Sequence, residues 1–127
     1  MRNNWKRAIG AWGPAVVYMA VIFTLSAQSK LPAAPGILGW DKLQHLIAYA
    51  VMGLLLFRAA ILRPLTRLGP YLMTLIIGAL HGAADEYHQS FVPGRNMSAH
   101  DWAADVLGLV LALAILRMAT HRTNQGG

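Results

Sequence analysis

The amino-acid sequence predicts an all-α fold, an integral membrane bundle of four transmembrane helices with both termini in the cytoplasm. The 127-residue chain is 56% hydrophobic and only 13% charged. Ordinary globular chains carry roughly 25% charged residues. The apolar residues also gather into four stretches, each close to the roughly 20 residues that span a bilayer as a helix. Because 127 residues leave room for one domain, we expect a single domain over residues 1–127.

The expected helices cover about residues 10–27, 43–62, 71–91 and 99–118. A basic segment precedes the first stretch, but its length and the lack of a small-residue cleavage site favour a retained helix over a signal peptide. Proline and glycine separate the others at Pro35 and Gly36, Pro64 and Pro70, and Pro93. Backbone groups in lipid need internal partners, so helices are expected within each stretch.

The charged residues predict the orientation. With the N-terminus in the cytoplasm, eight of the eleven basic residues lie inside: Arg2, Lys6, Arg7, Arg58, Arg63, Arg67, Arg117 and Arg122. Lys30, Lys42 and Arg95 then lie outside, on the side that holds all five acids. This asymmetry follows the positive-inside rule. Because the basic residues are scattered at the ends of segments, the net charge of +6 does not indicate a nucleic-acid partner.

Most of the polar residues that could bind a ligand or take part in a reaction are expected at the outer ends of the last three helices. In DKLQHLIAY, residues Asp41, His45 and Tyr49 recur at intervals of four and share one side of a helix. In SAHDWAADVLG, Asp101 and Asp105 lie one turn apart. Ionisable groups at such depths are costly, so we expect them to face the bundle interior or a wet cavity.

The third block is HGAADEYHQSFVPGR, where four residues share one face: His81, Asp85, His88 and Gln89. Glu86 points about 100° away from that face. We favour an ion pair of Arg95 with Asp85 or Glu86 over recognition of a phosphate or carboxylate by Arg95. Ser98 is a plausible N-cap of the last helix.

Together these blocks resemble the VanZ-like membrane proteins, a family named for an accessory protein of glycopeptide resistance. The resemblance covers about residues 26–108 and rests on DKLQH, DEYHQSFVPGR and the Asp101–Gly108 segment. It implies the bacterial cytoplasmic membrane and reduced susceptibility to teicoplanin-type antibiotics. It picks out His45, Asp85, Glu86, Gln89, Arg95 and Asp101. The chain departs from the family where it has Asp105, because asparagine is usual there.

Three functions stay open. The first is a pocket that binds a lipid-linked or cell-wall-related molecule or an antibiotic, through His45, Tyr49, Asp85, Glu86, Gln89, Arg95, Asp101 and Asp105. The second is a membrane hydrolase or transferase with His45, Asp85 and Glu86 as catalytic candidates. The third is a structural or assembly factor. The expected partners are the bilayer and such a ligand, and the sequence does not determine the oligomeric state.

No cofactor is expected, although the sequence leaves a divalent metal as a weaker alternative. Zero cysteines exclude a zinc–thiolate site and a cysteine nucleophile. Imidazoles with a carboxylate suit zinc or manganese, and the candidates beyond the residues above are His81 and His88. Their spacing is not that of an HExxH motif.

Overall fold

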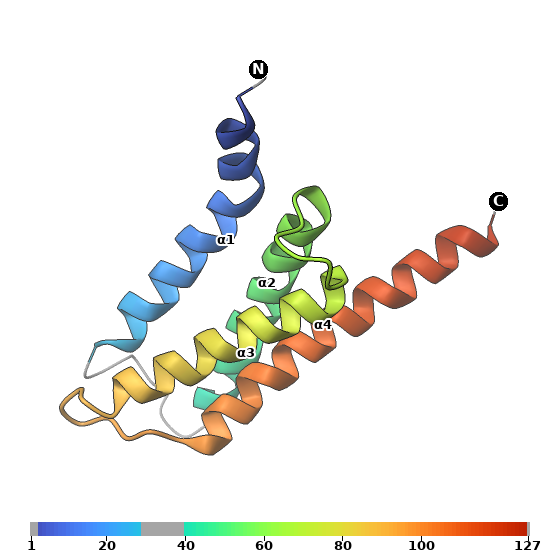
Figure 1. The fold of residues 1–127 in the computed structure, drawn as a ribbon. Helices are drawn as coiled ribbons and strands as arrows, with labels where there is room; N and C mark the ends of the chain where they lie inside the picture. Colours follow the sequence, from blue (N-terminus) through green and yellow to red (C-terminus); the bar gives the residue numbers. More distant parts are fainter. Residues whose placement is uncertain (1–2, 29–39, 127) are drawn as a thin grey trace.

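The computed structural model describes residues 3–28 and 40–126, and these residues form four α-helices. The helices are α1 (Asn4–Ser26), α2 (Trp40–Leu62), α3 (Pro70–Gln89) and α4 (Ala99–Gln125). They run alternately up and down, so that the two ends of the chain lie away from the α3–α4 connection (Figure 1). The four expected helices are therefore present. The first begins at Asn4 instead of near residue 10, and the last continues to Gln125 instead of ending near Met118, because neither proline nor glycine occurs at residues 4–9 or 119–125.

The ends of the helices follow local chemistry. Pro70 occupies the first turn of α3, where its missing N–H removes no helical hydrogen bond. The hydroxyl of Ser98 accepts a hydrogen bond from the backbone N–H of Asp101 at 3.2 Å, which confirms the expected N-cap of α4. In the α3–α4 connection, Gly94 has a φ of 79°, a conformation that other residues rarely adopt.

The centre of the bundle is the contact between α2 and α4. A Cβ atom at Gly108 would lie 2.3 Å from the carbonyl oxygen of Leu46, so only glycine allows this approach. Small residues permit such close backbone contact between membrane helices. Tyr49, Met52 and Leu109 form the buried core around it. α3 packs on both helices, whereas α1 packs mainly on α2.

The surface of the bundle is largely apolar. Three helices are long and apolar enough to cross a membrane: α1, α2 and α4. Large hydrophobic side chains point outward along the bundle, for example Val17, Leu80 and Ile115, which are each at least 60% exposed. These features indicate a multi-pass membrane protein.

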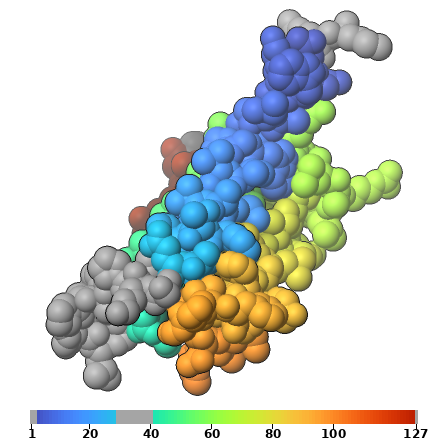
Figure 2. All heavy atoms as spheres, turned by 90° about the vertical axis from the view of Figure 1, so that its left-hand side faces the viewer, coloured from blue at the N-terminus to red at the C-terminus, as the bar shows by residue number. Residues whose placement is uncertain are grey.

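The charged residues separate along the bundle. Near the α3–α4 connection lie the acids of α2, α3 and α4, and at the opposite end Arg58 and Arg63 contact the N-terminal half of α1. Arg2 and Lys30 lie outside the described residues. Figure 2 shows α1 crossing one face of the molecule, with its C-terminal part beside the α3–α4 connection. The polar site is built at this end.

Candidate functional site

A histidine–carboxylate pair joins α2 to α4. The Nδ1 atom of His45 lies 2.8 Å from Oδ1 of Asp105, and its Nε2 atom lies 3.9 Å from Oδ2 of Asp101. Because Asp101 and Asp105 are one helical turn apart, both carboxylates face the same imidazole. When Asp105 is ionised, its carboxylate only accepts hydrogen bonds, and Nδ1 of His45 is then the donor. This contact orients the ring.

Glu86 faces α4, which agrees with its expected rotation away from Asp85. Its Oε2 atom accepts a hydrogen bond from the backbone N–H of Ser98 at 2.9 Å. In a capping box, an acid in the first turn of a helix accepts a hydrogen bond from the backbone N–H of the N-cap residue. Here Glu86 of α3 does this for Ser98, the N-cap of α4. Only 3% of Glu86 is exposed. One of its oxygens is thus held by the backbone.

Asp85 and His81 connect α3 to α1. Asp85 accepts a hydrogen bond from the hydroxyl of Ser26, the last residue of α1. His81 contacts the carbonyl oxygen of Met19 through Nε2, at 3.1 Å, and the hydroxyl of Tyr49 through Nδ1, at 3.0 Å. Both nitrogens of His81 are therefore occupied. His88 instead stacks on Phe23 of α1.

Among the lysines and arginines that the structure describes, Lys42 pairs with the acids of this end. Its Nζ atom lies 2.6 Å from Oδ1 of Asp101 and 2.7 Å from Oδ2 of Asp41. Sequence reasoning assigned Lys42 to this membrane side but not to the site. Its position within DKLQH, beside an acid and three residues before His45, was the available signal.

Arg95 does not make the ion pair that we favoured from the sequence. Its Nε atom donates to the carbonyl oxygen of Gln28 at 3.1 Å, and no ion pair joins Arg95 to Asp85 or Glu86 within residues 3–28 and 40–126. The two acids already accept hydrogen bonds from Ser26 and Ser98. The Arg95 side chain instead extends over a pocket.

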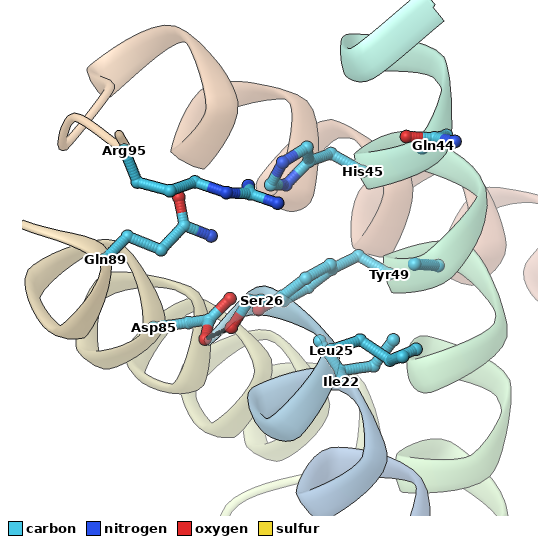
Figure 3. A pocket seen from close by; sticks show the side chains of 10 residues that line it. Ile22, Leu25, Ser26, Gln44, His45, Tyr49, Asp85, Gln89 and Arg95 are labelled. Carbon is cyan, nitrogen blue, oxygen red and sulfur yellow. Dashed lines mark hydrogen bonds between the residues drawn. The ribbon is translucent and has the colours of Figure 1, made fainter. Parts of the chain in front are cut away.

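This pocket, of about 270 Å³, lies between α1, α2 and α3. Figure 3 shows Arg95 reaching across it toward His45, above Gln89 and Asp85. Its lining residues are Ile22, Leu25, Ser26, Gln44, His45, Ala48, Tyr49, Asp85, Gln89 and Arg95. The side-chain nitrogen of Gln89 is buried and has no hydrogen-bond partner among the described residues. The pocket therefore combines an apolar wall with polar groups.

The structure divides the expected site residues into two connected groups. His45, Tyr49, Asp85, Gln89 and Arg95 line the pocket. The others, Glu86, Asp101 and Asp105, lie with His45 where α2, α3 and α4 meet. Ser26 and Gln44 also line the pocket but were not expected in the site. Gln44 belongs to the DKLQH block, whereas no motif marked Ser26, because a serine near a helix end is common without a functional role.

Comparison with known proteins identifies the family. No similar protein was found among curated proteins or among solved structures. The family model described as VanZ/LLP1 matches residues 7–120. Because the match covers most of the 127 residues, including both groups of polar residues, the chain belongs to the VanZ/LLP1 family.

Proposed function

We propose that this chain is a bacterial cell-envelope protein of the cytoplasmic membrane whose pocket binds an anionic, lipid-linked molecule at the outer membrane face. The observation that carries the proposal is the pocket between α1, α2 and α3. One wall is apolar, with Ile22, Leu25 and Ala48, and hydrogen-bond donors from Gln89 and Arg95 reach its polar part. A lipid-linked anion has the same combination of an apolar chain and a charged group.

The donors suit a phosphate or a carboxylate. Among the hydrogen bonds of the described residues, Arg95 uses only Nε, so its terminal nitrogens are available for a planar anion. Gln89 adds a buried N–H donor that lacks a partner in the described part of the chain. A volume of about 270 Å³ is smaller than the roughly 300–1,000 Å³ of pockets for drug-sized ligands. It therefore fits a headgroup better than a whole glycopeptide, and reduced antibiotic susceptibility would follow from binding the lipid-linked molecule.

The orientation supports this proposal. α3 has 20 residues, which is about 30 Å of helix and enough for a fourth crossing. Its polar residues are covered by the other helices: Asp85 and His81 contact α1, and Glu86 contacts α4. With the arginine-rich end and both termini in the cytoplasm, the positive-inside rule places the pocket at the outer face.

A binding assay with a matched arginine control tests the proposal. The full chain in nanodiscs is titrated with dodecyl phosphate, and with dodecanol as the uncharged control. We expect dodecyl phosphate to bind more tightly than dodecanol. We expect Arg95→Gln to weaken phosphate binding roughly 10- to 100-fold, the range expected for losing one hydrogen bond to a charged group. Arg58→Gln is the control, because Arg58 also donates to a backbone carbonyl, that of Gly10 in α1, but at the opposite end of the bundle. The proposal is contradicted if Arg95→Gln and Arg58→Gln bind dodecyl phosphate equally well. It is also contradicted if the wild type binds dodecyl phosphate and dodecanol equally well.

A second candidate is a membrane hydrolase or transferase that acts on the same molecule. The observation in its favour is His45, which lines the pocket while Asp105 orients its ring, as in many general bases. Asp85 lines the same pocket, and Glu86 lies behind His45. Release of inorganic phosphate from dodecyl phosphate during the incubation would favour the enzyme. His45→Gln should then abolish this release but still bind dodecyl phosphate.

A purely structural role is less well supported. A network that only locks the helices together is expected to satisfy its buried polar atoms. Within the described residues, Gln89 Nε2, which lines the pocket, is buried without a hydrogen-bond partner. This unsatisfied donor is better explained by a ligand.

A further inference from the structure

Three potential metal ligands meet behind the pocket. His45 comes from α2, Glu86 from α3 and Asp105 from α4, and one donor atom of each lies within 4.8 Å of the other two. Glu86 and Asp105 do not line the pocket described above. The group is therefore a separate feature that shares only His45 with the pocket.

Two oxygens of this group are unsatisfied. Oε1 of Glu86 and Oδ2 of Asp105 are buried and have no hydrogen-bond partner among the described residues. The two residues are 3% and 0% exposed. Burying a carboxylate without a partner is costly, and within a membrane such groups require compensation.

The basic residues nearby are engaged elsewhere. Lys42 contacts Asp41 and Asp101, and Arg95 donates to the carbonyl of Gln28. In the part of the chain that the structure describes, neither lysine nor arginine forms an ion pair with Glu86 or Asp105. Among the described residues, His45 is the group that could supply the positive charge these carboxylates need, and a bound cation is the other source.

The other oxygen of each carboxylate already has a contact. The backbone N–H of Ser98 holds Oε2 of Glu86, and Nδ1 of His45 lies 2.8 Å from Oδ1 of Asp105, a contact that an ion bound at Nδ1 would replace. A Cβ atom at Gly82 would lie 3.1 Å from Oδ2 of Asp105, so any side chain at this position would crowd the free oxygen. The hydrogen bond from Ser98, which lies outside the group, orients Glu86 in a way that is typical of the surroundings of metal sites.

We propose that His45, Glu86 and Asp105 bind one divalent transition-metal ion. An imidazole with two carboxylates suits Zn²⁺ or Mn²⁺, whereas Ca²⁺ and Mg²⁺ prefer oxygen ligands alone. The ion balances the two carboxylates and joins α2, α3 and α4. The inference goes beyond the proposed lipid binding, because it concerns different atoms and needs no lipid.

Protons are the competing explanation. A protonated His45 paired with Asp105, together with a protonated Glu86, would also leave the group neutral. The two explanations differ in what the purified protein takes up. A metal site binds one equivalent of ion and gains thermal stability from it, whereas a protonated cluster does neither.

Cobalt is a suitable probe because its visible absorption reports nitrogen and oxygen ligation. The full chain in detergent is treated with a chelator, dialysed and titrated with Co²⁺ alone, and the bound ion is then displaced by Zn²⁺. We expect one equivalent of Co²⁺, a ligand-field absorption and a higher unfolding temperature. Asp105→Asn, which keeps the shape of the side chain, should weaken Co²⁺ binding at least 10-fold. Asp41→Asn is the control, because it removes an exposed acid that pairs with Lys42 at the same end.

Two results would overturn the inference. One is wild-type protein that neither binds Co²⁺ nor gains thermal stability with ions in excess, a measurement that depends on no variant. The other is Asp105→Asn protein that binds Co²⁺ as tightly as Asp41→Asn. Arg95→Gln protein is expected to keep its metal, so a failure of lipid binding and a failure of metal binding can be told apart.

Discussion

Replacing Gly108 with alanine places a methyl group at the backbone contact between α2 and α4. The added Cβ would lie 2.3 Å from the carbonyl oxygen of Leu46 and 3.0 Å from the backbone nitrogen of Ala50. Both are main-chain atoms of α2, so no side-chain rotation relieves the overlap. An ordinary contact begins at 3.4 Å, so the two helices must separate locally by about 1 Å, as overpacking of a filled interior demands.

The cost follows from two opposing terms. Overpacking of this kind destabilises a protein by about 1–3 kcal/mol, and backbone overlap belongs at the upper end of that range. Alanine recovers up to about 1 kcal/mol through its higher helix propensity. We therefore expect Gly108→Ala to lower the free energy of unfolding by about 2 kcal/mol.

The same displacement should disturb the site. Leu46 follows His45 in α2, and Gly108 lies one turn after Asp105 in α4. A separation of about 1 Å would stretch the 2.8 Å contact between His45 and Asp105 beyond hydrogen-bond range. Loss of Co²⁺ binding should therefore accompany the loss of stability.

The assay is unfolding in a detergent series, followed by helix content, with Gly10→Ala as the control. Gly10 lies in α1, and a Cβ atom there meets nothing within 4 Å. This variant should be as stable as the wild type or up to about 1 kcal/mol more stable. If Gly108→Ala and Gly10→Ala unfold at the same detergent concentration, the described approach of α2 and α4 is wrong.

Two further predictions concern α1 and the topology. Tyr18→Phe removes the hydrogen bond from its hydroxyl to the carbonyl oxygen of Ala48 at 2.8 Å and should cost about 0.6 kcal/mol, the average for such bonds between membrane helices. Tyr87→Phe is its control, because Tyr87 is 64% exposed, and equal losses in both would show that the α1–α2 contact does not contribute. Cysteines at Asn4 and Asn124 should be labelled only from the cytoplasm, and one at Asn96 only from outside. Labelling of Asn124 from outside in intact cells would mean an odd number of crossings.

The helices could be predicted because their causes are local. Runs of apolar residues, Pro70 at the start of α3 and Ser98 as a cap of α4 act within a few positions of the chain. The family resemblance was also visible from the sequence, because the three polar blocks that carry it are contiguous strings. The grouping of His45 with Asp101 followed from their shared membrane depth, which hydropathy and charge already indicated.

The partners within the site could not be predicted, because they depend on the rotation and separation of the helices. Arg95 is close in sequence to Asp85 and Glu86, yet the turn at Gly94 leads its side chain to the carbonyl of Gln28. Glu86 reaches the backbone of Ser98 across a helix boundary.

By itself, therefore, the sequence determined which four segments contain helices, which end of the bundle is acidic and to which family the chain belongs. Only the tertiary structure decided that Glu86 and Asp105 meet at His45 with one free oxygen each. The physical reason is the close approach at Gly108, which determines how α4 sits against α2. Such a contact depends on side-chain volumes on two helices far apart in the chain, and no local pattern encodes it.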